Sequence, residues 1–180
     1  MAVKVQRPDM LRRVTLDLFL IRGYFHIVER TKGFLMRHGF LRKRRKFDLP
    51  MFDAFAAASL LELDYRNEAS NQEFFKRELN KRMAGDVYVP EVYHEASSDK
   101  VLCMEWITGT PLATSSPDEI KRLVPVGVEC FLIQLLELGR FHSDPHPGNL
   151  LVEDTVSPSC PSGRRRLVLL DFGLCAKIQR

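Results

Sequence analysis

Two short acidic segments near the carboxyl end of the chain contain the residues best suited to chemistry. The first, residues 141–149, reads Phe-His-Ser-Asp-Pro-His-Pro-Gly-Asn, and the second is Asp171-Phe172-Gly173. A fixed aspartate can orient an attacking hydroxyl or water, and aspartate and asparagine oxygens are ligands that suit Mg²⁺. Asp144 is therefore a candidate for orienting a nucleophile, and Asn149 and Asp171 are candidate ligands of a metal ion.

The apolar residues beside these segments predict how they meet. Residues 149–152 and 167–170 read as two short buried strands, and residues 153–166 between them as a hairpin loop. Such a hairpin would bring Asn149 close to Asp171. Within the loop, the polar and Pro-rich stretch 157–163 reads as a disordered surface insertion.

Simpler explanations of the first segment are a Pro-rich turn of no function, or a hydrolase metal site. In the hydrolase, the alternating residues His142, Asp144 and His146 would bind the metal from one face of a strand. Pro145 and Pro147 oppose this, because they deny the segment a regular strand ladder. The order and first spacing of Asp144, Asn149 and Asp171 instead resemble the catalytic loop and metal-binding motif of kinases.

A candidate phosphate-binding lysine lies at the start of the chain. Met1–Gln6 alternates small apolar and polar residues and predicts a strand, which resembles the Val-Ala-Ile-Lys strand of kinases and makes Lys4 its lysine. Residues 64–83 read as one long helix with Glu68 in its first turn. Because a buried charge must be paired, Glu68 is the best partner for Lys4. The simpler explanation is that Asp64 and Glu68 only complement the helix dipole.

The remaining segments predict mainly helices before Asp64 and strands after Met83. Residues 9–40 read as an amphipathic helix or helical pair broken near Gly33 and Gly39, and residues 51–63 as a buried helix. Residues 88–95 and 101–107 read as strands joined by a turn, with residues 105–107 linking two lobes. A core helix over 118–138 then leads to the catalytic loop.

Length, composition and charge limit the class of protein. The 180 residues are 45% hydrophobic and 28% charged with a net charge of +4, as in a soluble globular protein, and this mild charge predicts no nucleic acid partner. The four cysteines lack Cys-x-x-Cys spacing and read as reduced core thiols. The basic stretch 37–46 reads as a solvated face, with a membrane surface or an acidic partner as the alternative.

Taken together, these motifs resemble the UbiB-like, or ABC-one, atypical kinases associated with coenzyme Q and other prenyl-quinones. The resemblance covers nearly the whole chain and includes a long helical insertion between the lysine and the glutamate. It rests on Val-Lys-Val-Gln-Arg-Pro at 3–8, Glu62-Leu63-Asp64-Tyr65 with Glu68-Ala69, Val89-Pro90-Glu91-Val92, the 144–149 loop and Leu170-Asp171-Phe172-Gly173.

The resemblance implies an α+β, protein kinase-like fold that starts at the lysine strand and stops just after Asp-Phe-Gly. Residues 1–106 would be a partial small lobe carrying the helical insertion at about 9–60, and residues 107–180 a partial large lobe. It further implies that Lys4, Glu105, Glu62 and Asp64 bind the cofactor ATP, the last two as a Glu-x-Asp motif. Lys4 and Glu68 would act with Asp144 in catalysis, beside Mg²⁺ on Asn149 and Asp171.

The expected function is therefore ATP and magnesium binding with phosphoryl transfer or ATP hydrolysis, linked to prenyl-quinone metabolism. The resemblance suggests mitochondrion or plastid, peripheral to a membrane, with a membrane surface or lipid-metabolism proteins as partners. The alternatives are a small-molecule phosphotransferase of the aminoglycoside or choline kinase type and a non-enzymatic pseudokinase scaffold. Because the turn that covers the phosphates precedes the lysine strand in kinases, this chain alone is expected to be a poor catalyst.

Overall fold

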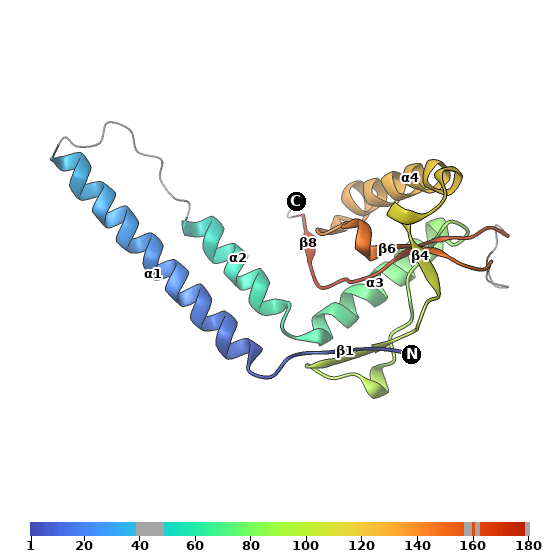
Figure 1. Cartoon of the computed structure of the whole chain (residues 1–180), viewed down its shortest axis with the longest axis horizontal. Helices are drawn as coiled ribbons and strands as arrows, with labels where there is room; N and C mark the ends of the chain where they lie inside the picture. The colour runs from blue at the N-terminus through green and yellow to red at the C-terminus, as the bar shows by residue number, and fades with distance from the viewer. Residues whose placement is uncertain (39–48, 157–159, 161–162, 179–180) are drawn as a thin grey trace. The chain divides into compact units, whose positions relative to one another are not determined.

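The computed structural model describes residues 1–38, 49–156, 160 and 163–178, which form two compact units (Figure 1). One unit, here called the helical unit, comprises Gln6–Leu63. The other, the site unit, combines Met1–Val5 with Asp64–Arg180. The basic segment predicted to face solvent, a membrane or an acidic partner lies almost wholly in 39–48, outside the described residues.

The helical unit is a pair of helices, α1 (Met10–Arg37) and α2 (Leu49–Leu61), that run side by side in Figure 1. Arg22 Nε donates to Asp53 Oδ1 at 2.8 Å, joining the two helices across their exposed sides. The rings of Phe25 and Phe52 meet edge to face at 5.6 Å between centroids. An ion pair and an aromatic contact are thus among the interactions that join the two helices.

Two predictions for these helices are wrong. α1 continues through Gly33 without a break, because a single glycine inside a long helix costs only about 1 kcal/mol relative to alanine. Gly39, the second predicted break, lies outside the described residues. α2 is not a buried helix: Phe52 is its one buried residue among those described, and Met51 and Phe55 are 65% and 60% exposed. An Ala-rich apolar sequence favours a helix but does not determine what covers it.

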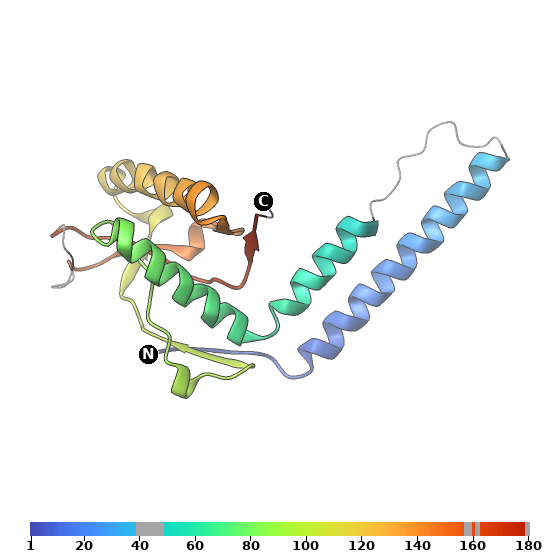
Figure 2. The ribbon, with the colours of Figure 1, turned by 180° about the vertical axis from the view of Figure 1, so that it is seen from behind.

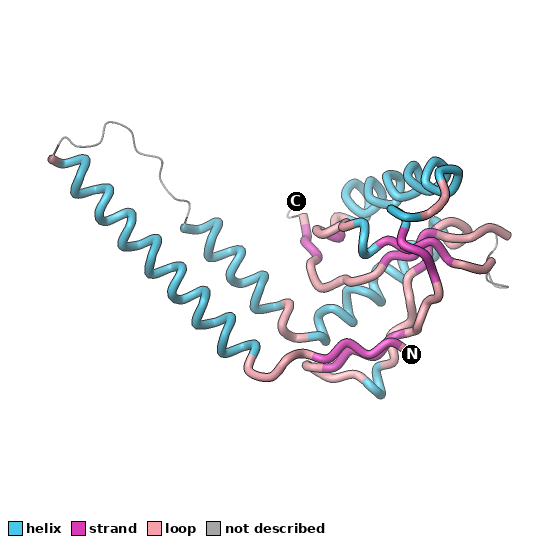
Figure 3. The backbone as a smooth tube through the Cα atoms, in the orientation of Figure 1, coloured by secondary structure: helices cyan, strands magenta, loops and turns pink. Residues whose placement is uncertain are grey.

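The predicted lysine strand is confirmed as β1 (Ala2–Val5), which pairs antiparallel with β3 (Val101–Met104). The two strands lie side by side near the N-terminus in Figure 3. Lys4 is opposite Leu102, and side chains alternate so that Val3 and Val5 face solvent while Lys4 faces inward. The alternation therefore directs the lysine into the site unit.

A second sheet has four strands in the order β2 (Val87–Tyr88), β7 (Leu167–Leu169), β6 (Leu150–Glu153) and β4 (Gly109–Pro111). β6 and β7 are antiparallel, which confirms the predicted hairpin. A third ribbon pairs β5 (Arg140–His142) antiparallel with β8 (Cys175–Lys177). The predicted catalytic loop thus lies between β5 and β6, and the Asp-Phe-Gly turn lies between β7 and β8.

Two long helices pack with these strands: α3 (Tyr65–Met83) and α4 (Pro117–Leu132), the latter continued by a π-helical turn, η3 (Ile133–Leu138). Figure 2 brings α3 to the front of the site unit. Short 3₁₀ turns are η1 (His94–Ala96), η2 (Leu112–Thr114) and η4 (Pro147–Asn149). The predicted helices at 64–83 and 118–138 are confirmed, as is the mixed α and β architecture. The core cluster contains Phe75, Leu79, Met83, Val87, Val89, Leu112, Leu123, Cys130, Val152, Leu167, Leu169 and Phe172.

The strand predicted over 88–95 is mostly wrong. β2 ends at Tyr88, a single bridge joins Val92 to Met104, and η1 replaces the end of the predicted strand. Pro90 lacks the N–H that a regular ladder would need at that point. The strand predicted over 101–107 likewise ends at Met104, before the segment predicted to link the lobes.

The loop between β6 and β7 is closed by a buried ion pair. Arg166 donates through Nη2 to Glu153 Oε1 at 2.7 Å and through Nε to Oε2 at 3.0 Å, and both residues are buried. Cys160, within the stretch predicted to be a disordered surface insertion, is buried and donates its thiol to Arg164 O, whereas 157–159 and 161–162 lie outside the described residues. None of the helices that the structure describes is both long and apolar enough to span a bilayer.

Candidate functional site

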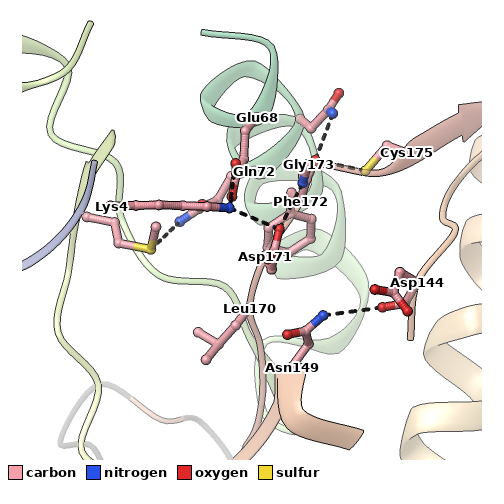
Figure 4. A network of polar contacts seen from close by, with 12 residues as sticks. Lys4, Glu68, Gln72, Asp144, Asn149, Leu170, Asp171, Phe172, Gly173 and Cys175 are labelled. Atoms are coloured by element: carbon pink, nitrogen blue, oxygen red, sulfur yellow. Dashed lines mark hydrogen bonds and ion pairs between the residues drawn. The ribbon is translucent and has the colours of Figure 1, made fainter. Parts of the chain in front are cut away.

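The predicted pairing of Lys4 with Glu68 is present in the structure, although 64 positions of sequence separate the two. Lys4 Nζ donates to both carboxylate oxygens of Glu68, at 2.8 and 2.9 Å (Figure 4). The Glu68 side chain is only 2% exposed, whereas that of Lys4 is 37% exposed. Strand β1 supplies the cation and the first turn of α3 the anion, so the contact fixes α3 against β1.

Asp171 is the second carboxylate on the same lysine. Lys4 Nζ lies 3.3 Å from Asp171 Oδ1, and the N–H of Gly173 donates to that oxygen, also at 3.3 Å. The backbone of Asp171 has φ = 56°, a mildly strained left-handed conformation that Asp and Asn adopt more readily than other residues with a Cβ. Such strain persists only where the surroundings hold the residue in place, and it is concentrated at functional sites.

Unequal burial sets the charges of this group. Burial alone would lower the pKa of Lys4, but the hydrogen bond and charge of Glu68, together with Asp171, raise it above its ordinary value. For Glu68 burial is also the largest influence and raises its pKa, because Lys4 offsets it only in part. Burial acts to raise the pKa of Asp171 as well, yet the charge of Lys4 and the N–H of Gly173 hold it below its ordinary value. With both acids ionised, two carboxylates face one ammonium, and the excess negative charge favours a cation.

The catalytic-loop prediction places Asp144 and Asn149 in one connected turn. Asn149 Nδ2 donates to the backbone O of Asp144 at 3.4 Å, and its N–H donates to His146 O at 2.8 Å. The side chain of Asp144 is exposed. Asn149 directly precedes β6, and its carbonyl accepts from the N–H of Leu170 at 2.9 Å. The hairpin therefore holds Asn149 beside Leu170, the residue before Asp171.

His142 joins the catalytic loop to the Asp-Phe-Gly turn. Its Nδ1 accepts from the N–H of Asp144 at 3.2 Å, and its Nε2 lies 3.2 Å from Leu170 O. Because a carbonyl oxygen can only accept, the proton of the neutral ring is on Nε2. The ring is buried and serves to position the residues on either side of it.

These contacts oppose the metal hydrolase explanation of His142, Asp144 and His146. Both ring nitrogens of His142 are used within the scaffold, and His146 Nδ1 accepts from the N–H of Gly148 at 3.1 Å. Across the described part of the chain, no three His, Cys, Asp or Glu side chains are grouped so that they could hold a metal ion.

A cavity of about 420 Å³ extends from Lys4 and its two carboxylate partners into an apolar slot. Its polar side is formed by Lys4, Glu68, Asn149 and Asp171, which together with Glu105 brings five of the predicted site residues to one space. The other residues of the lining are Ala2, Met104, Glu105, Trp106, Ile107, Gly109, Leu151 and Leu170. Such a slot suits a flat heterocycle that carries an anionic group toward the lysine. Asp144 is not part of this lining.

The other predicted cofactor residues are placed differently. Glu105 lines the cavity, but its carboxylate accepts from Tyr88 OH at 2.6 Å and from the N–H of Glu91 at 3.1 Å. Asp64 is the N-cap of α3, accepting from the N–H of Arg66 at 3.0 Å, and is not among the residues that line the described cavity. Glu62 follows α2 in the helical unit, so its role toward the cofactor remains a prediction.

Sequence reasoning missed the buried amides of α3. Asn71 and Gln72, 7% and 1% exposed, follow Glu68 by three and four residues and therefore share its face of the helix. Asn71 Nδ2 donates to Phe172 O and Gln72 Nε2 to Pro90 O, each at 2.9 Å. The available signal was two amides spaced with the predicted glutamate inside an otherwise amphipathic helix.

Comparison with known proteins identifies the kind of domain. The ABC1 atypical kinase-like domain matches residues 1–180. The uncharacterized protein sll0005 of Synechocystis is 38% identical over 184 residues, covering 99% of this chain and 24% of the relative. The Arabidopsis thaliana protein ACTIVITY OF BC1 COMPLEX KINASE 3, chloroplastic, is 38% identical over 181 residues, covering 98% of this chain and 23% of the relative. The chain thus spans about a quarter of the length of these two relatives.

A solved structure is similar over almost the whole chain. It is the complex of Rv3197 with erythromycin from Mycobacterium tuberculosis, with a TM-score of 0.67 and 26% sequence identity. The similarity covers 98% of this chain and 40% of that one.

Proposed function

Since the chain belongs to the ABC1 atypical kinase-like domain family and has its protein kinase-like fold, we propose that it binds ATP and Mg²⁺ for phosphoryl transfer or ATP hydrolysis. The observation that carries this proposal is the sharing of Lys4 between Glu68 and Asp171 at one end of the cavity. Glu68 fixes the ammonium from the buried side. The Lys4 side chain is 37% exposed, so its ammonium remains able to contact a phosphate.

The residues present fit a magnesium ion. Asp171 has a side chain that is 47% exposed, and Asn149 lines the same cavity, so a carboxylate and an amide supply the oxygen ligands that Mg²⁺ prefers. The excess negative charge beside Lys4 supports the same conclusion. When bound, the ion would neutralise charge on the phosphates, and the protein would contribute mainly positioning.

Asp144 is proposed to orient the hydroxyl or water that attacks the terminal phosphate. Its carboxylate is exposed, while its N–H is held by His142 and its carbonyl by Asn149, so the backbone is fixed and the side chain is available. A fixed acid or base of this kind contributes about 10²- to 10⁴-fold in rate.

Nucleotide binding without turnover is the second candidate function. It is favoured by the position of Asp144 outside the cavity lining. A small-molecule phosphotransferase would use the same residues, and membership of the atypical kinase family favours the first proposal over it.

Compartment and pathway belong to the proposal as well. A plastid location is supported by the chloroplastic Arabidopsis relative, and mitochondrion remains the alternative. A link to prenyl-quinone metabolism, and to a membrane surface or lipid-metabolism proteins as partners, rests on the UbiB-like motifs of the sequence.

The test is ATP turnover in magnesium by the wild type, Asp144→Asn and the control Asp118→Asn, in the first turn of α4. We expect Asp144→Asn to lose at least about tenfold in turnover with nucleotide affinity within twofold, because this residue acts on the nucleophile. Asp118→Asn should match the wild type. Turnover that Asp144→Asn leaves unchanged would contradict this role of Asp144, and nucleotide binding without turnover in a version extended to the length of the relatives would establish the second candidate.

A further inference from the structure

The buried face of α3 that carries Glu68 is polar rather than apolar. Glu68, Asn71 and Gln72 are 2%, 7% and 1% exposed, and burying such groups is costly unless each finds a partner. Glu68 pairs with Lys4, and Gln72 donates to Pro90 O. Glu68 also lies against the segment that holds Asp171, whereas Asn71 contacts its backbone, through the carbonyl of Phe172.

The orientation of the Asn71 amide is determined by Arg140. Arg140 Nη2 donates to Asn71 Oδ1, and a guanidinium has only donors, so the oxygen of the amide must face it. The Nδ2 group is then directed to Phe172 O, 2.9 Å away. Arg140 is itself held over the ring of Phe74, 4.8 Å from its centroid, and it opens β5, the strand that leads to His142.

The hydrogen bond from Asn71 reaches the Asp171 carboxylate through one peptide group. Phe172 C=O and Gly173 N–H belong to the same planar trans peptide, so they point in opposite directions. Fixing the carbonyl toward Asn71 therefore aims the N–H at Asp171 Oδ1, where it donates at 3.3 Å. A rotation of this peptide would withdraw the N–H and release the carboxylate.

Besides Asn71, the carbonyl of Phe172 accepts a weaker hydrogen bond from the thiol of Cys175, whose Sγ lies 3.3 Å from the oxygen (Figure 4). The ring of Phe172 is buried and stacks on Phe75 with centroids 5.4 Å apart, which fixes the side chain but not the carbonyl. Gly173 contributes no side chain, and a Cβ there would lie 3.3 Å from Asp171 Oδ1. The strained φ of Asp171 makes such support necessary.

We infer that Asn71, oriented by Arg140, is a positioning residue that sets the 172–173 peptide and so aims the Asp171 carboxylate at the metal ion. The Arg140–Asn71–Phe172 bridge would thereby link three elements: β5 before the catalytic loop, helix α3 with Glu68, and the turn that carries Asp171. The metal part of this inference rests on the proposed function, whereas the peptide orientation does not.

The test compares Asn71→Asp with Gln72→Met, an adjacent buried amide of the same helix that donates to a carbonyl away from Asp171. Asn71→Asp keeps an acceptor for Arg140 but replaces the donor by an oxygen that repels Phe172 O. With a fluorescent ATP analogue, we expect the magnesium concentration at half-saturation to rise about 10- to 100-fold, the scale of a lost hydrogen bond to a charged group. Affinity without magnesium should stay within twofold. Gln72→Met should leave the magnesium dependence unchanged even if it lowers stability.

A second readout needs no ligand. In the ¹⁵N-labelled chain, the Gly173 amide should shift upfield in Asn71→Asp, in the same direction as in Asp171→Asn, and stay in place in Gln72→Met. Arg140→Met, which leaves Asn71 present but frees its amide, should give a smaller shift of the same sign.

If the Gly173 amide resonance does not move, the positioning inference is wrong, whatever the binding data show. If it moves while half-saturation is unchanged, the link to the metal is wrong. A wild type that binds no nucleotide would refute the proposed function and leave the Gly173 result to decide the positioning.

Discussion

Lys4 is shared by two carboxylates of very different exposure, Glu68 at 2% and Asp171 at 47%. The buried one anchors the ammonium, and the exposed one is available to a cation. The two roles follow from the difference in burial. Burial raises the pKa of Glu68, whereas Lys4 and the Gly173 N–H hold the pKa of Asp171 low.

The opposite pKa shifts of Glu68 and Asp171 predict how the substitution Glu68→Gln changes the pH dependence of folding stability. A raised folded pKa means that the folded state binds the proton more tightly than the unfolded one, so the stability contribution of Glu68 falls as pH rises from about 4.5 through that folded pKa. The stability of the wild type minus that of the variant should therefore decrease over this window. Asp171 has the opposite effect, because its contribution to stability is lost only as pH falls below about 3.8. It is present in both proteins. Urea unfolding between pH 3.5 and 7.5 measures the difference, and a difference that grows with pH would contradict the assignment.

At this scale the sequence predicts ionic partners better than neutral ones. The spacing of Asp144, Asn149 and Asp171 and the pairing of Lys4 with Glu68 could be predicted because each residue type has few roles when buried. Asn71 and Arg140 could not, because an amide serves equally well on a solvated helix face, and only the tertiary structure shows the carbonyl that it meets.

Among the elements, helix α3 depends on its first turn. Asp64 has extended backbone and accepts from the N–H of Arg66, as an N-cap residue does, directly before the turn that carries Glu68. The resemblance to UbiB-like kinases gave Asp64 a cofactor role, and the structure adds a capping role. The two roles can be separated by substitution.

Asp64→Ala should destabilise the chain by about 0.5–2 kcal/mol, the usual cost of losing an N-cap, and Asp64→Asn by much less because the amide oxygen still caps. Thermal unfolding without ligand measures both. Asp64→Asn also tests the cofactor role, since it keeps the cap but removes the charge. Equal destabilisation by the two substitutions would show that charge, rather than capping, is what α3 needs there.

The β6–β7 hairpin depends on the buried pair of Glu153 and Arg166, whose side chains are 9% and 6% exposed. Arg166→Met alone should cost about 3–5 kcal/mol, because it leaves the Glu153 carboxylate buried without a partner. The double variant Glu153→Met, Arg166→Met should recover most of that loss. Urea denaturation of the three proteins decides this, and a double variant no more stable than Arg166→Met would contradict it. The sequence did not indicate this pair, because both residues lie at the ends of a long polar loop.

At the scale of the whole molecule, the two units differ in how much they bury. The site unit has one large apolar cluster, whereas α1 exposes many large apolar side chains and α2 buries Phe52 alone among its described residues. The periodicity that predicted these helices correctly could not predict their exposure, since amphipathic spacing shows that a face is apolar but not what covers it. The sheets were harder to predict, because β2 and β4 are too short to leave a pattern.

Local opening of the backbone should therefore be more frequent in α1 and α2 than in α3. We expect amides of α1 and α2 to exchange hydrogen at least about tenfold faster than those in the middle of α3, because local opening costs less where few apolar contacts are lost. Hydrogen exchange followed by mass spectrometry measures this on the intact chain. Equal protection of α1, α2 and α3 would show that the helical unit has packing that its exposed side chains do not reveal.

The measurement that tests the central claim most directly is the magnesium dependence of nucleotide binding in the wild type and Asp171→Asn. A fluorescent ATP analogue is titrated with and without Mg²⁺, with Asp154→Asn as the control, since the Asp154 side chain is exposed and accepts from the hydroxyl of Thr110 on β4. Asp171→Asn should weaken binding by about 1–3 kcal/mol with magnesium, the scale of a lost charge-assisted contact, and leave metal-free binding nearly unchanged. Asp154→Asn should bind as the wild type does in both conditions. Equal loss with and without magnesium, or magnesium-dependent binding that survives in Asp171→Asn, would contradict the site as described.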